Sequence, residues 1–180
     1  MLISADAPTA NMKKEAIRTD LPAIGLPFSW GVRLENFVFL AGHGPLGSDG
    51  KLIEGDIRLQ TRKALENFRK VVEAGGSSLE HVVSTTVYLK DLEDFRGMNE
   101  VYAEFFTGEP RPARATVRAD LLLGMKVEIQ GIAYVPGGES IQSSGRIRAS
   151  MAKKKKSKKA AKKKAYYAGR KERRPRSKRG

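Results

Sequence analysis

The sequence predicts an α+β domain, in which a mixed β-sheet carries two helices on one face, followed by a separate basic tail. Two stretches have the apolar spacing of helices, and others show the alternation or the Val, Ile and Thr content of strands. These elements follow in the order β, ββ, α, β, α, ββ, which is typical of a layered α+β fold. The charge also divides the chain. Residues 1–150 hold 18 Lys and Arg against 19 Asp and Glu, whereas residues 151–180 hold 16 against 1.

The composition narrows the class of protein. At 180 residues the chain is long enough for one ordinary domain with an appendage. It has no cysteine and only two histidines, His43 and His81, so we expect neither disulfides nor a metal site. No basic segment followed by an apolar run opens the chain, and no stretch is apolar enough for a membrane span. We therefore expect a cytoplasmic protein, or a nuclear one if the chain is eukaryotic.

The first elements form a strand and a hairpin. We expect residues 1–14 to be a flexible N-terminus, because they are small and polar without periodicity. Two prolines and a glycine make residues 21–27 a loop, and Glu35 and Asn36 form the turn of the hairpin. The predicted strands are 15–20, 29–33 and 37–41.

A glycine-rich segment follows the hairpin. Residues 42–47, with the sequence GHGPLG, fit the pattern G-x-G-x-x-G of dinucleotide sites. Such a site must open a helix whose N-terminus holds the pyrophosphate, whereas Pro45 and the turn at residues 48–50 intervene here. We interpret the segment as a strand exit and not as a nucleotide site.

Two amphipathic helices and a strand occupy the middle of the chain. Asp56 is the expected N-cap of a helix that runs to Ala74 and ends at Gly75 and Gly76. Its apolar stripe consists of Ile57, Thr61, Ala64, Leu65, Phe68, Val71 and Val72. Residues 82–89 read as a central strand. Residues 94–106 form the second helix, which presents Met98, Val101, Tyr102 and Phe105 to the core.

The stretch 111–134 reads as two strands joined by a short turn, at 113–120 and 126–134. On neighbouring strands the guanidinium of Arg114 can meet the carboxylate of Glu128. Arg114 is then either a bidentate clamp for a bound carboxylate or the structural partner of Glu128. Desolvation would raise the pKa of Glu128 and Arg114 would lower it, and both directions stay open.

Several ordered blocks resemble the reactive-intermediate deaminase family, known as RidA or YjgF. They are PARATV at 112–117, VEI at 127–129, FLAGH at 39–43 and TTVYLKDL at 85–92, joined by Phe95, Asn99, Phe105, Phe106 and Ala133. The resemblance covers residues 15–136. It implies a chorismate-mutase-like subunit that forms a homotrimer with active sites in the clefts between subunits.

The resemblance also implies a reaction. Short 2-imino acids such as 2-iminopropanoate and 2-iminobutanoate, or their enamine tautomers, would be hydrolysed to 2-keto acids and ammonia without a cofactor. Arg114 would clamp the substrate carboxylate, and Glu128 would position the attacking water. The further substrate-binding positions are Phe28, Gly42, His43, Asn99 and Thr116.

Some of these positions depart from the family pattern or have a second interpretation. Phe28 stands where tyrosine is usual, Thr116 where cysteine is common and Ala41 where serine is common, so the preferred substrate stays open. His43 is equally well interpreted as an exposed loop histidine, and Asn99 as a surface residue of its helix.

The resemblance does not extend to the C-terminal residues. We interpret 137–150 as a linker and 151–180 as a disordered Lys- and Arg-rich tail. Such a run predicts nucleic-acid binding with strong salt dependence, although nuclear import or contact with an anionic membrane would use the same charges. The alternative function is therefore an RNA-binding protein on a trimeric RidA-like platform. The predicted contacts are Lys153, Lys154, Lys155, Lys156, Lys158, Lys159, Lys162, Lys163 and Lys164.

Overall fold

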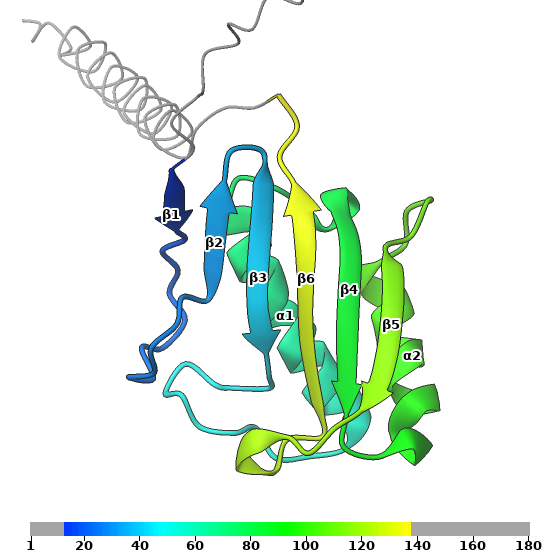
Figure 1. Ribbon diagram of the computed structural model, residues 1–180. Coiled ribbons are helices and arrows are strands. Elements are labelled where there is room, and N and C mark those ends of the chain that lie inside the picture. Colours follow the sequence, from blue (N-terminus) through cyan, green and yellow to red (C-terminus); the bar gives the residue numbers. More distant parts are fainter. Residues whose placement is uncertain (1–12, 138–180) are drawn as a thin grey trace, which may run out of the picture. The chain divides into compact units, whose positions relative to one another are not determined.

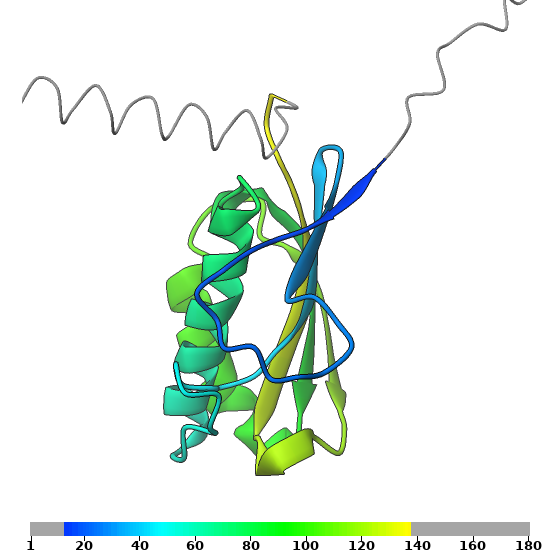
Figure 2. The same ribbon diagram turned by 90° about the vertical axis from the view of Figure 1, so that its left-hand side faces the viewer.

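A six-stranded mixed sheet with two helices on one face makes up the computed structural model, which describes residues 13–137 (Figures 1 and 2). Residues 1–12 of the predicted flexible N-terminus, residues 138–150 of the predicted linker and the whole predicted basic tail lie outside the described residues. The strands are β1 (Lys14–Ala16), β2 (Gly31–Leu34), β3 (Phe37–His43), β4 (Val82–Leu89), β5 (Ala113–Arg118) and β6 (Val127–Tyr134). The helices are α1 (Ile57–Ala74) and α2 (Phe95–Phe105), with short 3-10 turns at Leu79–His81, Leu92–Asp94 and Leu122–Gly124. The predicted fold class is confirmed.

Helix α1 begins and ends as its sequence predicts. The Asp56 carboxylate accepts a hydrogen bond of 2.8 Å from the backbone amide of Leu59, and Gly76 follows the helix with a φ of +86°. All seven residues of the predicted apolar stripe are buried. In α2, Met98, Val101 and Tyr102 are buried, but Phe106 fills the core position expected for Phe105, which is half-buried. Within residues 13–137, neither helix combines the length and the apolar character that crossing a bilayer requires.

The core lies between the helices and one face of the sheet. Side chains that alternate along the strands, such as Val38, Val87 and Ile129, are fully buried on this side. The other face carries exposed aromatic rings, among them Phe37 and Phe39, whose ring centroids are 6.4 Å apart. A bare sheet face with exposed aromatic side chains is typical of a surface that another chain covers.

The predicted pairing of the last two strands is wrong. Strand β5 pairs only with β4, in parallel, and β6 lies between β3 and β4 (Figure 1). Because α2 connects β4 to β5, these elements form a crossover unit, which places parallel strands side by side. The alternation of side chains identified both strands, but it contains no information about which strand each would adjoin.

Strand boundaries also differ from the prediction. The first strand is limited to Lys14–Ala16, and β2 starts at Gly31 where residue 29 was expected. Strand β3 continues to His43, two residues further than predicted, because its pairing with β6 shifts register between Leu40 and His43 and then resumes. No helix opens at the glycine-rich segment that follows, since α1 begins only at Ile57. The rejection of a dinucleotide site at this segment therefore agrees with the structure.

Candidate active site

Glu128 is the second residue of β6, on the sheet face that the helices leave bare. Its neighbours Val127 and Ile129 are fully buried on the helix side, and Tyr88 of β4 is its cross-strand partner. The half-buried Glu128 carboxyl makes no hydrogen bond or ion pair with any residue between 13 and 137. Burial raises its pKa, and this resolves the direction that the sequence left open. A partly desolvated carboxyl group keeps its proton to a higher pH than an exposed glutamate, which makes it a candidate for proton exchange.

Gly42 of β3 gives the Glu128 side chain its place. A Cβ atom added at Gly42 would meet Oε1 of Glu128 and lie 2.6 Å from its Cδ atom. The carboxyl group therefore rests directly on the Gly42 backbone, which only glycine permits without a shift. Two of the predicted site residues, Gly42 and Glu128, are thus in contact.

Two buried amides on α1 fix the loops on either side of this contact. The Gln60 side chain accepts a hydrogen bond of 2.8 Å from the amide of Lys126, just before β6, and donates one of 3.1 Å to the carbonyl of Ile53. The Asn67 amide donates to the carbonyls of Gly44 and Leu46, at 3.1 and 2.9 Å, just after β3. Neither residue was predicted, although buried polar residues on an otherwise apolar helix face are a signal of such a role.

His43 lies in the core, so the interpretation as an exposed loop histidine is wrong. Its ring stacks on Trp30 with centroids 5.6 Å apart and meets the edge of Phe68 of α1 at 5.8 Å. Neither ring nitrogen has a well-formed hydrogen bond with a described residue. Burial lowers the pKa of His43 to about 4, and the nearby Trp30 backbone opposes this shift only weakly. The ring is therefore neutral and lies on the helix side of the sheet, away from Glu128.

Phe28 forms the outer end of a row of rings. It is exposed and meets Trp30 edge-on at a centroid distance of 5.1 Å. Trp30 in turn is held by a hydrogen bond of 3.1 Å from its Nε1 to the carbonyl of Pro22. Phe28 thus presents an exposed apolar surface, and Trp30 packs against its ring.

Arg114, Asn99 and Thr116 gather at the β5 edge of the sheet. The Arg114 guanidinium carbon lies 4.5 Å from the ring centroid of Tyr102 and 6.0 Å from that of Phe95, both on α2. Asn99, half-buried, is on the same helical stripe between these two rings. Thr116, also half-buried, follows Arg114 by two residues and shares its face of the strand.

Arg114 and Glu128 cannot meet within one chain, which contradicts the predicted structural pair. Strand β4 separates β5 from β6. Arg114 is aligned with Thr85, which is buried beneath α2, whereas Glu128 is aligned with Tyr88 on the opposite face. The structure therefore divides the predicted site into a β6 half-site, Gly42 and Glu128, and a β5 half-site, Asn99, Arg114 and Thr116.

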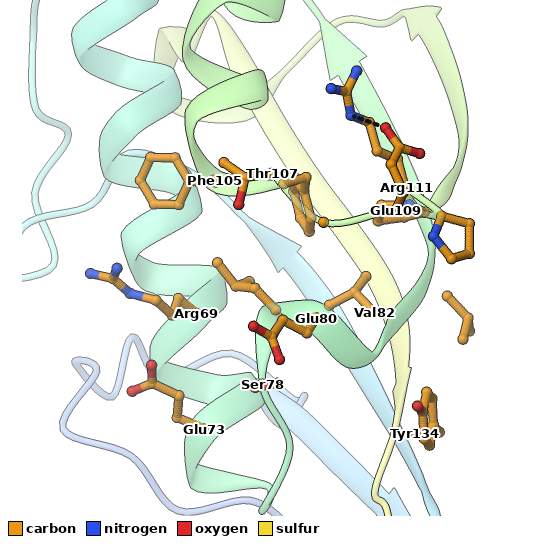
Figure 3. A pocket seen from close by; sticks show the side chains of 16 residues that line it. Arg69, Glu73, Ser78, Glu80, Val82, Phe105, Thr107, Glu109, Arg111 and Tyr134 are labelled. Atoms are coloured by element: carbon orange, nitrogen blue, oxygen red, sulfur yellow. Dashed lines mark ion pairs between the residues drawn. The ribbon is translucent and has the colours of Figure 1, made fainter.

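A groove on the described surface lies elsewhere. It has a volume of about 730 Å³ and is bordered by the C-terminal ends of α1 and α2, the start of β4 and the loop before β5 (Figure 3). An ion pair of 3.4 Å joins Arg111 to Glu109 at its rim. None of the predicted site residues lines it. The candidate site is therefore the pair of half-sites and not this groove.

The family is established by comparison with known proteins. The model described as Endoribonuclease L-PSP matches residues 19–135. The chain belongs to this family, which is the RidA/YjgF family. It is 44% identical over 125 residues to a RutC family protein of Pyrococcus horikoshii, which covers 68% of this chain and 98% of that protein. It is 36% identical over 125 residues to the 2-iminobutanoate/2-iminopropanoate deaminase of Escherichia coli, with coverage of 68% and 98%.

Solved structures of RidA/YjgF proteins have the same fold. The crystal structure of RidA from an Antarctic Psychrobacter species superimposes with a TM-score of 0.63 at 37% identity, covering 67% of this chain and 99% of that one. The resemblance inferred from the sequence is therefore confirmed, together with the chorismate-mutase-like fold.

Proposed function

We propose that this RidA/YjgF protein hydrolyses short 2-imino acids and their enamine tautomers to 2-keto acids and ammonia. The observation that carries the proposal is the Glu128 carboxyl, which is half-buried, has a raised pKa, makes no hydrogen bond or ion pair with a described residue and rests on the backbone of Gly42. A structural carboxylate would be paired or fully solvated. This one is free to hold a water molecule and to exchange a proton with it.

The chemistry needs few groups. The Glu128 carboxylate accepts a proton from water as the water oxygen bonds to the imine carbon, and it passes this proton to the imine nitrogen. In the resulting carbinolamine the carboxylate transfers the hydroxyl proton to the amine nitrogen as the carbon–nitrogen bond breaks, so that ammonia leaves and the keto oxygen derives from water. Arg114 binds the substrate carboxylate through two parallel hydrogen bonds, which fixes the imine carbon relative to the water.

The complete site is assembled from two protomers of a homotrimer. Because Arg114 and Glu128 lie on opposite faces of the sheet and on strands separated by β4, one molecule cannot apply both to the same substrate. If the bare sheet face with Phe37 and Phe39 is covered by neighbouring subunits, the β5 half-site of one protomer comes to the β6 half-site of the next. Phe28 then becomes an apolar wall at the junction.

Mixing two inactive variants tests both the reaction and the shared site. Release of ammonia from 2-iminobutanoate generated in situ is measured for the wild type, Arg114→Ala, Glu128→Gln and a mixture of the two variants that has been dissociated and reassembled. We expect each variant alone to have far lower activity than the wild type, and the mixture to recover about a quarter of wild-type activity, since about one junction in four then pairs an intact Arg114 with an intact Glu128.

The controls separate the possible failures. Reassembly of either variant alone should give no activity, and sedimentation should show that all samples are trimers. A mixture of trimers without recovered activity would contradict a site shared between protomers. Wild-type protein that releases ammonia no faster than buffer would contradict the deaminase proposal.

The second candidate function is association with RNA on a trimeric platform. It is favoured by the 16 Lys and Arg against one acidic residue in 151–180, since such a run gains affinity by releasing counterions from phosphates. RNA binding that weakens steeply with salt and disappears on deletion of 151–180 would support it. If the same protein shows no deaminase activity, this function replaces the first.

A further inference from the structure

The Arg114 guanidinium is held by aromatic rings alone. It is exposed on an edge strand and makes no hydrogen bond or ion pair with any residue in the described part of the chain. The ring of Tyr102 lies 4.5 Å from the guanidinium carbon and the ring of Phe95 lies 6.0 Å from it. A cation in this position is attracted to the negative face of the ring, and the nearer ring contributes more.

Tyr102 is itself fixed in place. Its hydroxyl forms a buried hydrogen bond of 2.8 Å with Oγ1 of Thr85, and its ring packs on Phe106 with centroids 4.5 Å apart. Thr85 is 1% exposed and is the residue of β4 aligned with Arg114 of β5. The Tyr102 ring therefore cannot tilt or shift without breaking a hydrogen bond in the core, which would leave a buried hydroxyl unpaired.

Burial also keeps the Tyr102 phenol neutral, since burial raises its pKa despite the hydrogen bond with Thr85 and the charge of Arg114. The guanidinium thus faces a neutral ring at all ordinary pH values. A long Arg side chain loses much conformational freedom when it binds a ligand. A ring that restricts the side chain beforehand lowers this cost, because part of the ordering is complete before the ligand arrives.

We propose that the Thr85–Tyr102 pair is a positioning element, which holds the Arg114 guanidinium ready for the substrate carboxylate. Neither residue touches the reacting atoms. The pair acts on substrate binding and not on proton transfer at Glu128, so its loss raises KM and leaves kcat nearly unchanged. This inference rests on the deaminase function for its kinetic consequence, but the restriction of Arg114 can be measured without any turnover.

The kinetic test compares variants that remove one feature at a time. Tyr102→Phe keeps the ring and loses the hydroxyl, Thr85→Val removes the other partner of the hydrogen bond, and Tyr102→Leu removes the ring. We expect KM for 2-iminobutanoate to rise about two- to tenfold in the first two, as for the loss of one buried hydrogen bond, and further in Tyr102→Leu. The matched control is Thr107→Val, which deletes the hydroxyl of an exposed threonine just beyond α2 and should change nothing.

A second readout uses the Nε–Hε signal of Arg114 in the NMR spectrum of the full-length protein. The ring current of Tyr102 should shift this proton strongly in the wild type. The shift should persist with weaker order in Tyr102→Phe and vanish in Tyr102→Leu. A titration then uses 2-oxobutanoate, a 2-keto acid that carries the same carboxylate. This ligand should bind more weakly to both variants than to the wild type.

Specific outcomes would overturn the inference. They are an Arg114 signal that is unchanged in Tyr102→Leu, a fall in kcat with constant KM, or an equal rise of KM in Thr107→Val. If the wild type proves to have no deaminase activity, the proposed function fails, and the Arg114 signal alone decides whether the pair holds the guanidinium. The two failures are therefore distinguishable.

Discussion

The two half-sites place their charged groups in contrasting surroundings. Arg114 projects from an edge strand, stays exposed and is supported by an aromatic ring, whereas Glu128 lies on a central strand, is half-buried and rests on Gly42. A permanent cation costs little to keep near water, but a carboxyl group must be partly desolvated before its pKa rises. One sheet thus provides an edge suited to recognising a charge and a centre suited to moving a proton.

Removing the carboxyl group at the β6 half-site should have the largest effect. We expect Glu128→Gln to lower kcat about 10²- to 10⁴-fold with little change in KM, since general acid–base catalysis is lost while the carboxylate clamp remains. The wild-type kcat should fall as pH falls through the raised pKa of Glu128, because the ionised form positions the water. This acidic limb should be absent from the pH profile of the residual activity in the variant.

The control for this prediction is Glu109→Gln, which neutralises a carboxylate at the groove and far from Gly42 in the fold. Its kcat and pH profile should match the wild type. A Glu128→Gln protein that keeps most of its kcat would show that the β6 half-site does not move the proton.

Displacing the Glu128 carboxyl group without removing it tests whether the position of this group matters as well as its presence. In Gly42→Ala the new methyl group would lie 2.6 Å from Cδ of Glu128, so the flexible side chain must move away. We expect kcat to fall about a hundredfold, as for a catalytic group misplaced by an ångström, with little change in melting temperature. Gly108→Ala, where an added Cβ meets nothing within 4 Å, is the control. An unchanged kcat in Gly42→Ala would mean that this contact does not place the carboxyl group.

The pH dependence of stability tests the burial of His43, which lies on the other side of the sheet from Glu128. Burial lowers its pKa from 6.5 to about 4, so between these values the unfolded chain binds a proton that the folded chain does not. As the pH is lowered through this window, the free energy of unfolding should therefore decrease, by about 2 kcal/mol near pH 5. This decrease should be absent in His43→Leu. Urea unfolding near pH 5 and near neutral pH measures both.

Glu128 contributes with the opposite sign and must be separated from His43. Its raised pKa means that the folded chain binds a proton more readily, so its contribution to stability is lost as pH rises through that pKa. This contribution is removed when the protein with His43 and the His43→Leu variant are compared in a Glu128→Gln background. If His43→Leu shows the same decrease in the free energy of unfolding at acidic pH, the decrease comes from another group.

The smallest effect concerns the shape of the cation at the β5 half-site. Arg114→Lys keeps the charge but loses the planar fork, so we expect KM to rise about tenfold and kcat to stay nearly constant. Arg118→Lys, on the same face of β5 and equally exposed, is the matched control. An Arg114→Lys protein with the KM of the wild type would show that the edge contributes only its charge.

The sequence alone determined the elements of this fold and the family, and it predicted the residues of the candidate site. The apolar stripe of α1, its Asp56 cap and the alternation along the strands depend on neighbours close in sequence, and these patterns can be read directly. The family blocks likewise named Arg114, Glu128, Gly42 and Asn99 as candidates. None of these inferences required knowing which strand lies beside which.

Only the tertiary structure decided how the elements are arranged. Period-2 alternation cannot say which strand neighbours which, so the insertion of β6 between β3 and β4 and the separation of Arg114 from Glu128 were not predictable. The burial of His43, the amides of Gln60 and Asn67 and the Thr85–Tyr102 hydrogen bond share this origin. Each depends on contacts between residues far apart in the chain, and the environment that such contacts create exists only once the sheet and helices have packed together.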